Sequence, residues 1–347
     1  MINKPTHCDI FCTVVDNYGD AGVCWRLARQ LADEYGWRLR LWIDDMAPLR
    51  QLAPDYAAGP VEVRAWTAPW LATDCADVVI EAFACELPAA YVETMAQRPR
   101  PPVWLNLEYL SAENWVAGCH AMSSPHTRLP LLKHFFFPGF TANSGGLLRE
   151  QDYHARRHAF DAKAFRAEFG LPAAAQDELT ISLFSYPNPA LPELMRAWAA
   201  SPRPVRLLRP GSSETPRSSG NLSVHNLPFL PQVRYDELLW SCDLNFVRGE
   251  DSFVRAQWAG KPFVWQIYPQ AGDAHQAKLD AFLAIHPAGP GLKAFWQAWN
   301  GGGTPPWEDF AASLPGLAAP MQQWANELAA GPDLASRLVQ FCIERLK

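Results

Sequence analysis

The sequence predicts an α/β protein with two doubly wound parallel sheets in tandem, facing each other across a cleft. In the first half, apolar runs of strand length alternate with helical or polar connections, the order typical of a parallel sheet with helices on both faces. The second half repeats this alternation, and the segment 149–170 between the halves is charged and helical in pattern. We therefore expect a first domain over residues 1–155, a second over 156–318, and C-terminal helices over 319–347 that pack back on the first domain.

The first strand is expected at Cys8–Val15, a short apolar run. Val23, Leu27 and Leu31 then recur at four-residue steps, so the period changes from strand to helix. The intervening DNYGDAG is expected to form a tight loop at the carboxyl end of the strand, before a helix over Ala21–Tyr35. Further strands of the first domain are expected at Arg38–Ile43, Val61–Trp66, Asp77–Phe83 and Val103–Leu110.

The second domain is expected to alternate in the same way. Its helices are predicted at Arg234–Cys242 and Asp251–Gly260, and the last stretch of the chain reads as helix broken at Gly331-Pro332. Its strands are predicted at Leu179–Tyr186, Val205–Pro210, Leu222–Leu230, Asp243–Gly249 and Pro262–Pro269.

Composition narrows the class of protein. With 347 residues and 49% hydrophobic content, the chain has enough apolar material for two cores. A formal net charge of -6 argues against nucleic acid as the principal partner. The N-terminal MINKPTHCDIF lacks a signal-peptide pattern, and no apolar run reaches the length of a membrane span, so we expect a cytoplasmic protein without a membrane partner. The eight cysteines form no Cys-x-x-Cys pair and read as reduced thiols.

The loop RGEDS suits a phosphate. Asp251 or Ser252 is available to cap the next helix, and the start of a helix offers unpaired N–H groups and the positive end of the dipole. Gly249 lets the backbone approach a ligand closely, and Arg248 could add a forked, charge-assisted contact. The alternative is a plain helix cap, with Arg248 paired to Glu250 at the surface.

The order of parts in the second half resembles the nucleotide-binding half of GT-B glycosyltransferases. Four segments together are similar to the bacterial protein-arginine rhamnosyltransferases that modify elongation factor P, and they lie between Phe11 and about Leu283: DNYGDAGVCWRLARQL, FSYPNPAL, LPFLPQ and RGEDSFVRAQWAGKPFVWQIYPQ. This resemblance implies a GT-B fold and an inverting glycosyltransferase. It also implies dTDP-β-L-rhamnose as donor, no further cofactor, and an arginine side chain of elongation factor P as acceptor.

The resemblance assigns catalytic residues to both domains. In the first-domain loop it implies Asp20 as the general base, with Asp16 beside it. In the second domain it implies that Glu250 is essential, with its role open between positioning and catalysis. The neighbouring Asn17, Tyr18 and Gly19 are expected to bind substrate.

The resemblance also assigns the donor site. Phe229 is expected to stack on the thymine, and Gln232 to read its edge. An aromatic platform and an amide that both donates and accepts suit a pyrimidine, although core packing and a turn are the alternative for this pair. The other matched donor, diphosphate and sugar positions are Phe184, Tyr186, Arg248, Asp251 and Ser252.

The acceptor chemistry explains the need for a carboxylate. A guanidinium has a pKa above about 12 and offers no lone pair when protonated. Asp20 can hold the guanidinium, orient one nitrogen and accept its proton, while Asp16 supplies a second acceptor. The alternative for Asp20 is a plain N-cap of the following helix.

No metal ion is expected. The pairs Asp16/Asp20 and Asp44/Asp45 lack histidines at ligand spacing, and a helix start with Arg248 can neutralise a diphosphate. Asp273 and His275 are expected near the cleft or in a solvated loop. Two other functions stay open: a GT-B transferase with another protein, lipid or small-molecule acceptor, and a nucleotide-binding regulatory protein without turnover.

Overall fold

The computed structural model describes residues 6–66, 75–269, 274–287 and 289–347, so the expectation for Asp273 lies outside the described residues. The chain forms two compact units: Met1–Gln151 with Gly331–Lys347, and Asp152–Ala330. The chain returns to the first unit at Gly331 and not at residue 319, because helix α12 (Trp307–Ala329) continues past that position. The predicted break at Gly331-Pro332 is where α12 ends and α13 (Leu334–Leu346) follows.

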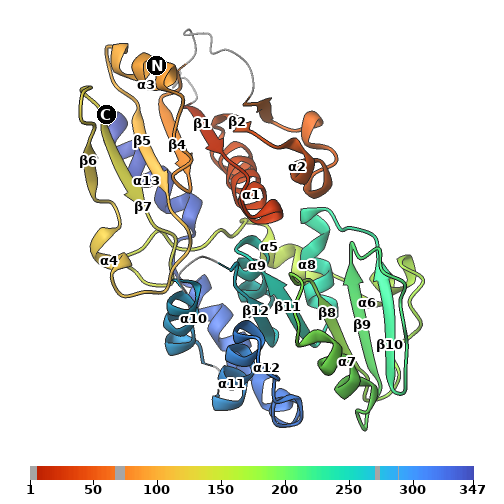
Figure 1. Ribbon diagram of the computed structural model, residues 1–347. Coiled ribbons are helices and arrows are strands. Elements are labelled where there is room, and N and C mark those ends of the chain that lie inside the picture. The colour runs from red at the N-terminus through yellow and green to blue at the C-terminus, as the bar shows by residue number, and fades with distance from the viewer. Residues whose placement is uncertain (1–5, 67–74, 270–273, 288) are drawn as a thin grey trace. The chain divides into compact units, whose positions relative to one another are not determined.

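The first unit is built on a seven-stranded sheet in the order β3-β2-β1-β4-β5-β7-β6 (Figure 1). Neighbouring strands are parallel except for β6, which runs antiparallel to β7. The strands β6 and β7 were not among those predicted from the sequence. The strands are β1 (His7–Cys12), β2 (Arg38–Ile43), β3 (Val61–Ala65), β4 (Val78–Ala82), β5 (Val103–Leu107), β6 (Ser123–Pro125) and β7 (Leu132–Phe136).

Helices cover both faces of this sheet. On one face, Tyr91 of α3 packs with Phe11 and Trp42, whose rings stack with centroids 5.9 Å apart. On the other face, α1 contacts β1 and β2, and α13 contacts β5. This two-sided burial explains why the strands read as continuous apolar runs. The helices are α1 (Asn17–Tyr35), α2 (Met46–Leu52), η1 (Tyr56–Ala58), α3 (Ala89–Gln97) and α4 (Val116–Cys119), together with α13.

The second unit holds a five-stranded, fully parallel sheet in the order β10-β9-β8-β11-β12 (Figure 1). Its strands are β8 (Leu179–Leu183), β9 (Val205–Pro210), β10 (Leu222–Leu227), β11 (Leu244–Arg248) and β12 (Phe263–Gln266). Its helices are α5 (Tyr153–Ala159), α6 (Ala162–Glu168), α7 (Leu191–Ala199), α8 (Gln232–Ser241), α9 (Asp251–Ala259), α10 (Ala274–Ile285), α11 (Pro290–Gly301) and α12.

The order of the parallel strands reverses once in each sheet, between β1 and β4 in the first and between β8 and β11 in the second. Ligands of open α/β sheets bind beyond the carboxyl ends of the strands at such points. All eight cysteines are free thiols. None of the helices in the described part of the chain is both long and apolar enough to span a membrane.

Candidate functional site

Asp20 lies at the carboxyl end of β1, in the first turns of α1. Its Oδ2 accepts hydrogen bonds from the backbone N–H groups of Val15 and Asp16, both at 2.8 Å. The prediction that α1 starts at Ala21 is therefore wrong. Because the Asp20 carboxylate reaches back to the chain before the helix, the helix begins at Asn17 and Asp16 stands at its N-cap. The DNYGDAG segment is mostly helix, and Asp20 is not a cap.

Asp20 is 2% exposed. This burial is the largest influence on the pKa of its carboxyl group, and it raises that pKa above the ordinary value. Hydrogen bonds from the backbone N–H groups of Asp16 and Val15 and from the side chain of Tyr109 partly offset this rise. A carboxylate with a raised pKa is a better proton acceptor than an exposed one.

Asp16 and the residues after it form the rest of the first-unit site. The Asp16 side chain makes no capping hydrogen bond, and its Oδ2 lies so close to Gly19 that a β-carbon there would come within 2.4 Å. Asn17 has a φ of 28°, in the left-handed region. The hydroxyl of Tyr18 donates to Oε1 of Gln51 at 2.5 Å, which ties this turn to α2.

Tyr109 is a residue that the sequence analysis missed. It follows β5, its side chain hydrogen-bonds to Asp20, and its ring stacks on Phe83 with centroids 4.3 Å apart. Phe83 follows β4 with a φ of 57°, an uncommon conformation for a bulky residue. The side chain of Asn106 supports this turn by accepting from the backbone N–H of Ala84 at 3.0 Å. Tyr109 lies inside the predicted strand Val103–Leu110, whereas β5 ends at Leu107, so the sequence pattern did not single it out.

In the second unit, Arg248 joins two of the predicted donor-site segments. Its guanidinium carbon lies 4.3 Å from the ring centroid of Phe184 and 4.6 Å from that of Tyr186. It also donates to the backbone oxygen of Ser185 at 3.3 Å. The structure therefore brings these residues together at the carboxyl ends of β8 and β11, where the strand order reverses.

The start of α9 differs from the prediction. Its N-cap is Glu250, without a side-chain capping bond, so neither Asp251 nor Ser252 caps the helix. The hydroxyl of Ser252 instead accepts from the N–H of Arg248 at 3.0 Å and donates to its carbonyl oxygen at 2.5 Å. Gly249 has a φ of 59°, which glycine adopts without strain. The loop is thus folded tightly onto the helix start.

Gln232 and Asp251 meet although they are predicted from separate segments. The amide Nε2 of Gln232 donates to Oδ2 of Asp251 at 2.8 Å, and Nε of Arg255 donates to the same oxygen at 3.1 Å. Gln232 and Asp251 are 5% and 7% exposed. The reason that Asp251 does not cap α9 is this engagement of its carboxylate with α8 and with Arg255.

Phe229 lies in the loop between β10 and α8 and is half-buried. Its ring lies against Gly211, which follows β9 with a φ of 71°; a β-carbon on Gly211 would come within 2.9 Å of the ring. The contact places Phe229 near the carboxyl end of β9, in the same sheet as β8 and β11.

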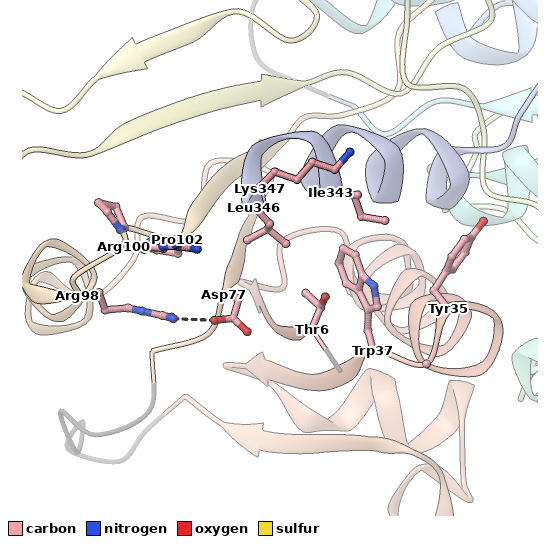
Figure 2. Close-up of a pocket in the computed structure, with 12 residues that line it drawn as sticks. Thr6, Tyr35, Trp37, Asp77, Arg98, Arg100, Pro102, Ile343, Leu346 and Lys347 are labelled. Atoms are coloured by element: carbon pink, nitrogen blue, oxygen red, sulfur yellow. Dashed lines mark hydrogen bonds and ion pairs between the residues drawn. The ribbon is translucent and has the colours of Figure 1, made fainter. Parts of the chain in front are cut away.

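A separate cavity lies at the amino ends of the strands of the first sheet, at the end opposite to Asp20. It has a volume of about 720 Å³ and is lined by residues that precede β1, β2, β4 and β5 and by the end of α13 (Figure 2). Arg98 donates to Asp77 there at 2.6 Å and also bonds the backbone oxygen of Cys75 at 2.7 Å. The cavity is therefore at the amino ends of the strands and contains none of the predicted site residues. Within the described ranges, no group of three or more His, Cys, Asp or Glu side chains could hold a metal ion.

Comparisons with known proteins show the family of this chain. The family model "Elongation-Factor P (EF-P) rhamnosyltransferase EarP" matches residues 8–343. Among the relatives, a protein-arginine rhamnosyltransferase of Pseudomonas aeruginosa is 47% identical over 371 residues, covering 96% of this chain and 98% of the relative. A protein-arginine rhamnosyltransferase of Pseudomonas putida is 48% identical over 368 residues, covering 96% and 97%.

Solved structures support the fold. The structure described as "Structural basis for EarP-mediated arginine glycosylation of translation elongation factor EF-P" is 36% identical with a TM-score of 0.69, covering 98% of this chain and 99% of that chain. Further GT-B glycosyltransferases, at 10–15% identity, reach TM-scores of 0.51–0.54 and share the fold alone. The predicted GT-B fold is confirmed, and the chain belongs to the EF-P rhamnosyltransferase family of glycosyltransferases.

Proposed function

We propose that this protein transfers L-rhamnose from dTDP-β-L-rhamnose to an arginine side chain of translation elongation factor P, with inversion at the sugar carbon. Relatives at 47% and 48% identity are protein-arginine rhamnosyltransferases, and the related structure concerns arginine glycosylation of this factor. The observation that carries the proposal is the buried Asp20 carboxylate beyond the carboxyl end of β1. Because the proposed acceptor is a translation factor, we also propose that the reaction takes place in the cytoplasm.

The acceptor requires a group that both orients it and removes a proton. A carboxylate can accept two charge-assisted bonds from a guanidinium and turn one nitrogen toward the sugar. Asp20 is held by two backbone N–H groups, so it is preorganised for this task. Asp16 is one helical turn before Asp20, and its carboxylate lies against Gly19. It supplies a second hydrogen-bond acceptor for the same planar guanidinium.

The proposed donor site lies in the second unit. Arg248 and the backbone N–H groups at the start of α9 bind the diphosphate and neutralise its charge. We therefore propose that no metal ion is needed. Phe184 and Tyr186, which lie against Arg248, complete the walls of this subsite. Ser252 keeps the Arg248 backbone in place through its hydroxyl.

The proposed bond changes are balanced without a further reagent. A terminal guanidinium nitrogen forms a bond to the anomeric carbon of rhamnose as the bond from that carbon to the diphosphate oxygen breaks. dTDP leaves with the electron pair, and the proton lost by the nitrogen passes to Asp20. Glu250, at the N-cap of α9, is proposed to act on the sugar or on the incoming arginine.

The test is the intact mass of elongation factor P after incubation with this protein and dTDP-rhamnose. An acceptor whose target arginine is replaced by lysine is run in parallel. A gain of one deoxyhexose on the natural acceptor alone is expected. If donor binding is measured by calorimetry but no acceptor gains mass, elongation factor P is not the substrate and another acceptor must be sought. Chelator should leave the transfer unchanged.

Asp20→Asn separates acceptor chemistry from donor binding. The variant keeps the shape of the side chain but lowers its capacity to accept a proton, so transfer should be nearly abolished. Donor affinity should be little changed, because the donor groups proposed above lie in the second unit. A large loss of donor affinity would show that Asp20 has a different role.

A further inference from the structure

A ladder of buried hydrogen bonds joins α8 and α9 behind the proposed base subsite. Gln232 and Asp236 are one turn apart on α8, and Asp251 and Arg255 are one turn apart on α9. Gln232 Nε2 donates to Asp251 Oδ2 at 2.8 Å, and Arg255 Nε donates to the same oxygen at 3.1 Å. Arg255 Nη1 then donates to Asp236 Oδ2 at 3.0 Å. Arg255 is 3% exposed and Asp236 is fully buried.

The ladder determines which way the Gln232 amide is turned. A carboxylate only accepts hydrogen bonds, so Gln232 must direct its NH₂ group at Asp251 and its carbonyl oxygen away from it. The opposite orientation would bring two oxygens together inside the protein, where such a contact is costly. Arg255 forms an ion pair with the Asp251 carboxylate and holds it in place.

We propose that Asp251 and Arg255 are positioning residues that set the base selectivity of the nucleotide site through Gln232. With its NH₂ group held by Asp251, Gln232 presents a carbonyl oxygen, which accepts from the N3–H of thymine. Cytosine has an acceptor at N3 and is repelled by the same oxygen. This inference rests on the proposed thymidine-diphosphate donor, and it gives Asp251 a position behind the base instead of one at the diphosphate.

The experiment measures the affinities of dTDP and dCDP by calorimetry for the full chain. In Asp251→Asn, the new amide can donate as well as accept, so Gln232 is free to turn over. We expect the preference for dTDP to fall about tenfold, the effect of one misdirected hydrogen bond. The lower preference should come from tighter binding of dCDP as well as from weaker binding of dTDP. A general loss of folding cannot make dCDP bind more tightly.

Arg255→Lys is the second variant, in case Asp251→Asn disturbs the fold. An ammonium group cannot hold two carboxylates in a fork as a guanidinium does, so the same change in preference is expected. Arg156→Lys is the matched control, because Arg156 also donates to Asp236 Oδ2, at 3.1 Å, but from α5. Its preference for dTDP should equal that of the unaltered protein.

The outcomes separate this inference from the proposed function. If the unaltered protein prefers dTDP and both variants keep the full preference, the positioning role is overturned while the donor assignment stands. If the unaltered protein does not discriminate between dTDP and dCDP, the donor assignment and the positioning role both fail. In Gln232→Ala, adding Asp251→Asn should change the preference no further, and a further change would contradict action through Gln232.

Discussion

A β-carbon on Gly19 would lie 2.4 Å from Oδ2 of Asp16, so the Asp16 carboxylate keeps its place only because residue 19 is glycine. Gly19→Ala should therefore displace Asp16 and lower the transfer rate by about a hundredfold, the effect of a shift of about 1 Å in a catalytic group. Alanine favours a helix by about 1 kcal/mol over glycine, so the loss would not come from a weaker α1. Transfer assays with donor in excess measure it.

The control for this substitution is Gly118→Ala. A β-carbon at Gly118 meets no atom within 4 Å, and the transfer rate should be unchanged. Full activity in Gly19→Ala would mean that the Asp16 carboxylate can move without consequence, and that Asp16 takes no part in the reaction.

Tyr109→Phe should move the pH dependence of transfer. The hydrogen bond from Tyr109 lowers the pKa of Asp20, against the larger rise caused by burial, so its removal raises that pKa. A base works only when deprotonated, and activity on the acidic side should therefore disappear at a higher pH in the variant. The ring and its stacking on Phe83 are retained. Initial rates between pH 5 and 9 test this, and an unshifted acidic limb would separate Tyr109 from the base.

The strands could be predicted because burial on both faces makes them continuous apolar runs. Arg38–Ile43 and Val205–Pro210 are strands over the predicted residues. The start of α1 could not be predicted in the same way. Local rules treat Asp20 as a cap for the residues after it, whereas its carboxylate bonds the N–H groups of Val15 and Asp16 before it.

The site was predictable segment by segment, but its internal contacts were not. Gln232 and Asp251 lie 19 positions apart on different helices, and no periodicity in the sequence links them. Tyr109 fell inside a predicted strand that ends at Leu107 in the structure. Once β5 stops at Leu107, Tyr109 is in the connection that follows the strand and can reach Asp20.

Phe229→Ala should weaken dTDP binding by about 1–3 kcal/mol, the usual contribution of an aromatic ring stacked on a base. The ring lies against Gly211, so its removal changes the wall of the loop without breaking a strand. Val233→Ala in the following helix is the control, because Val233 is 62% exposed. Titration calorimetry compares the two, and equal affinities would mean that Phe229 serves packing alone.

Arg40→Met should destabilise the first unit by about 3–5 kcal/mol. Arg40 and Asp9 are directly opposite on β2 and β1, and their buried side chains bond at 2.6 and 2.7 Å. The substitution would leave the Asp9 charge buried without that partner, which costs far more than the pair itself contributes. Urea unfolding measures the change. Arg29→Met, which breaks the exposed pair with Asp33, should cost at most about 1 kcal/mol.

His286 should make the stability of the second unit depend on pH. The residue is 3% exposed, and neither ring nitrogen has a hydrogen-bond partner in the described residues. The ring centroids of Phe282 and Trp296 lie 5.0 and 5.6 Å from that of His286. Burial, with a smaller effect of Lys293, lowers the pKa of His286 from 6.5 to about 3. The folded state thus favours neutral imidazole. The contribution of neutral His286 to the stability of the folded state is complete above pH 6.5. It is lost as the pH falls toward 3, because the unfolded chain then binds a proton that the folded chain does not.

His286→Phe should remove this dependence. Between pH 7.5 and 5, the unaltered protein should lose roughly 2 kcal/mol relative to the variant, since each pH unit below the unfolded pKa of 6.5 is equivalent to about 1.4 kcal/mol once one proton separates the two states. The variant should also be at least as stable at pH 7.5, because phenylalanine leaves no unpaired nitrogen in the aromatic cluster. Urea unfolding at pH 7.5 and 5 gives both differences. An equal loss of stability in the two proteins would show that His286 is protonated without unfolding, and that water reaches its ring in the folded state.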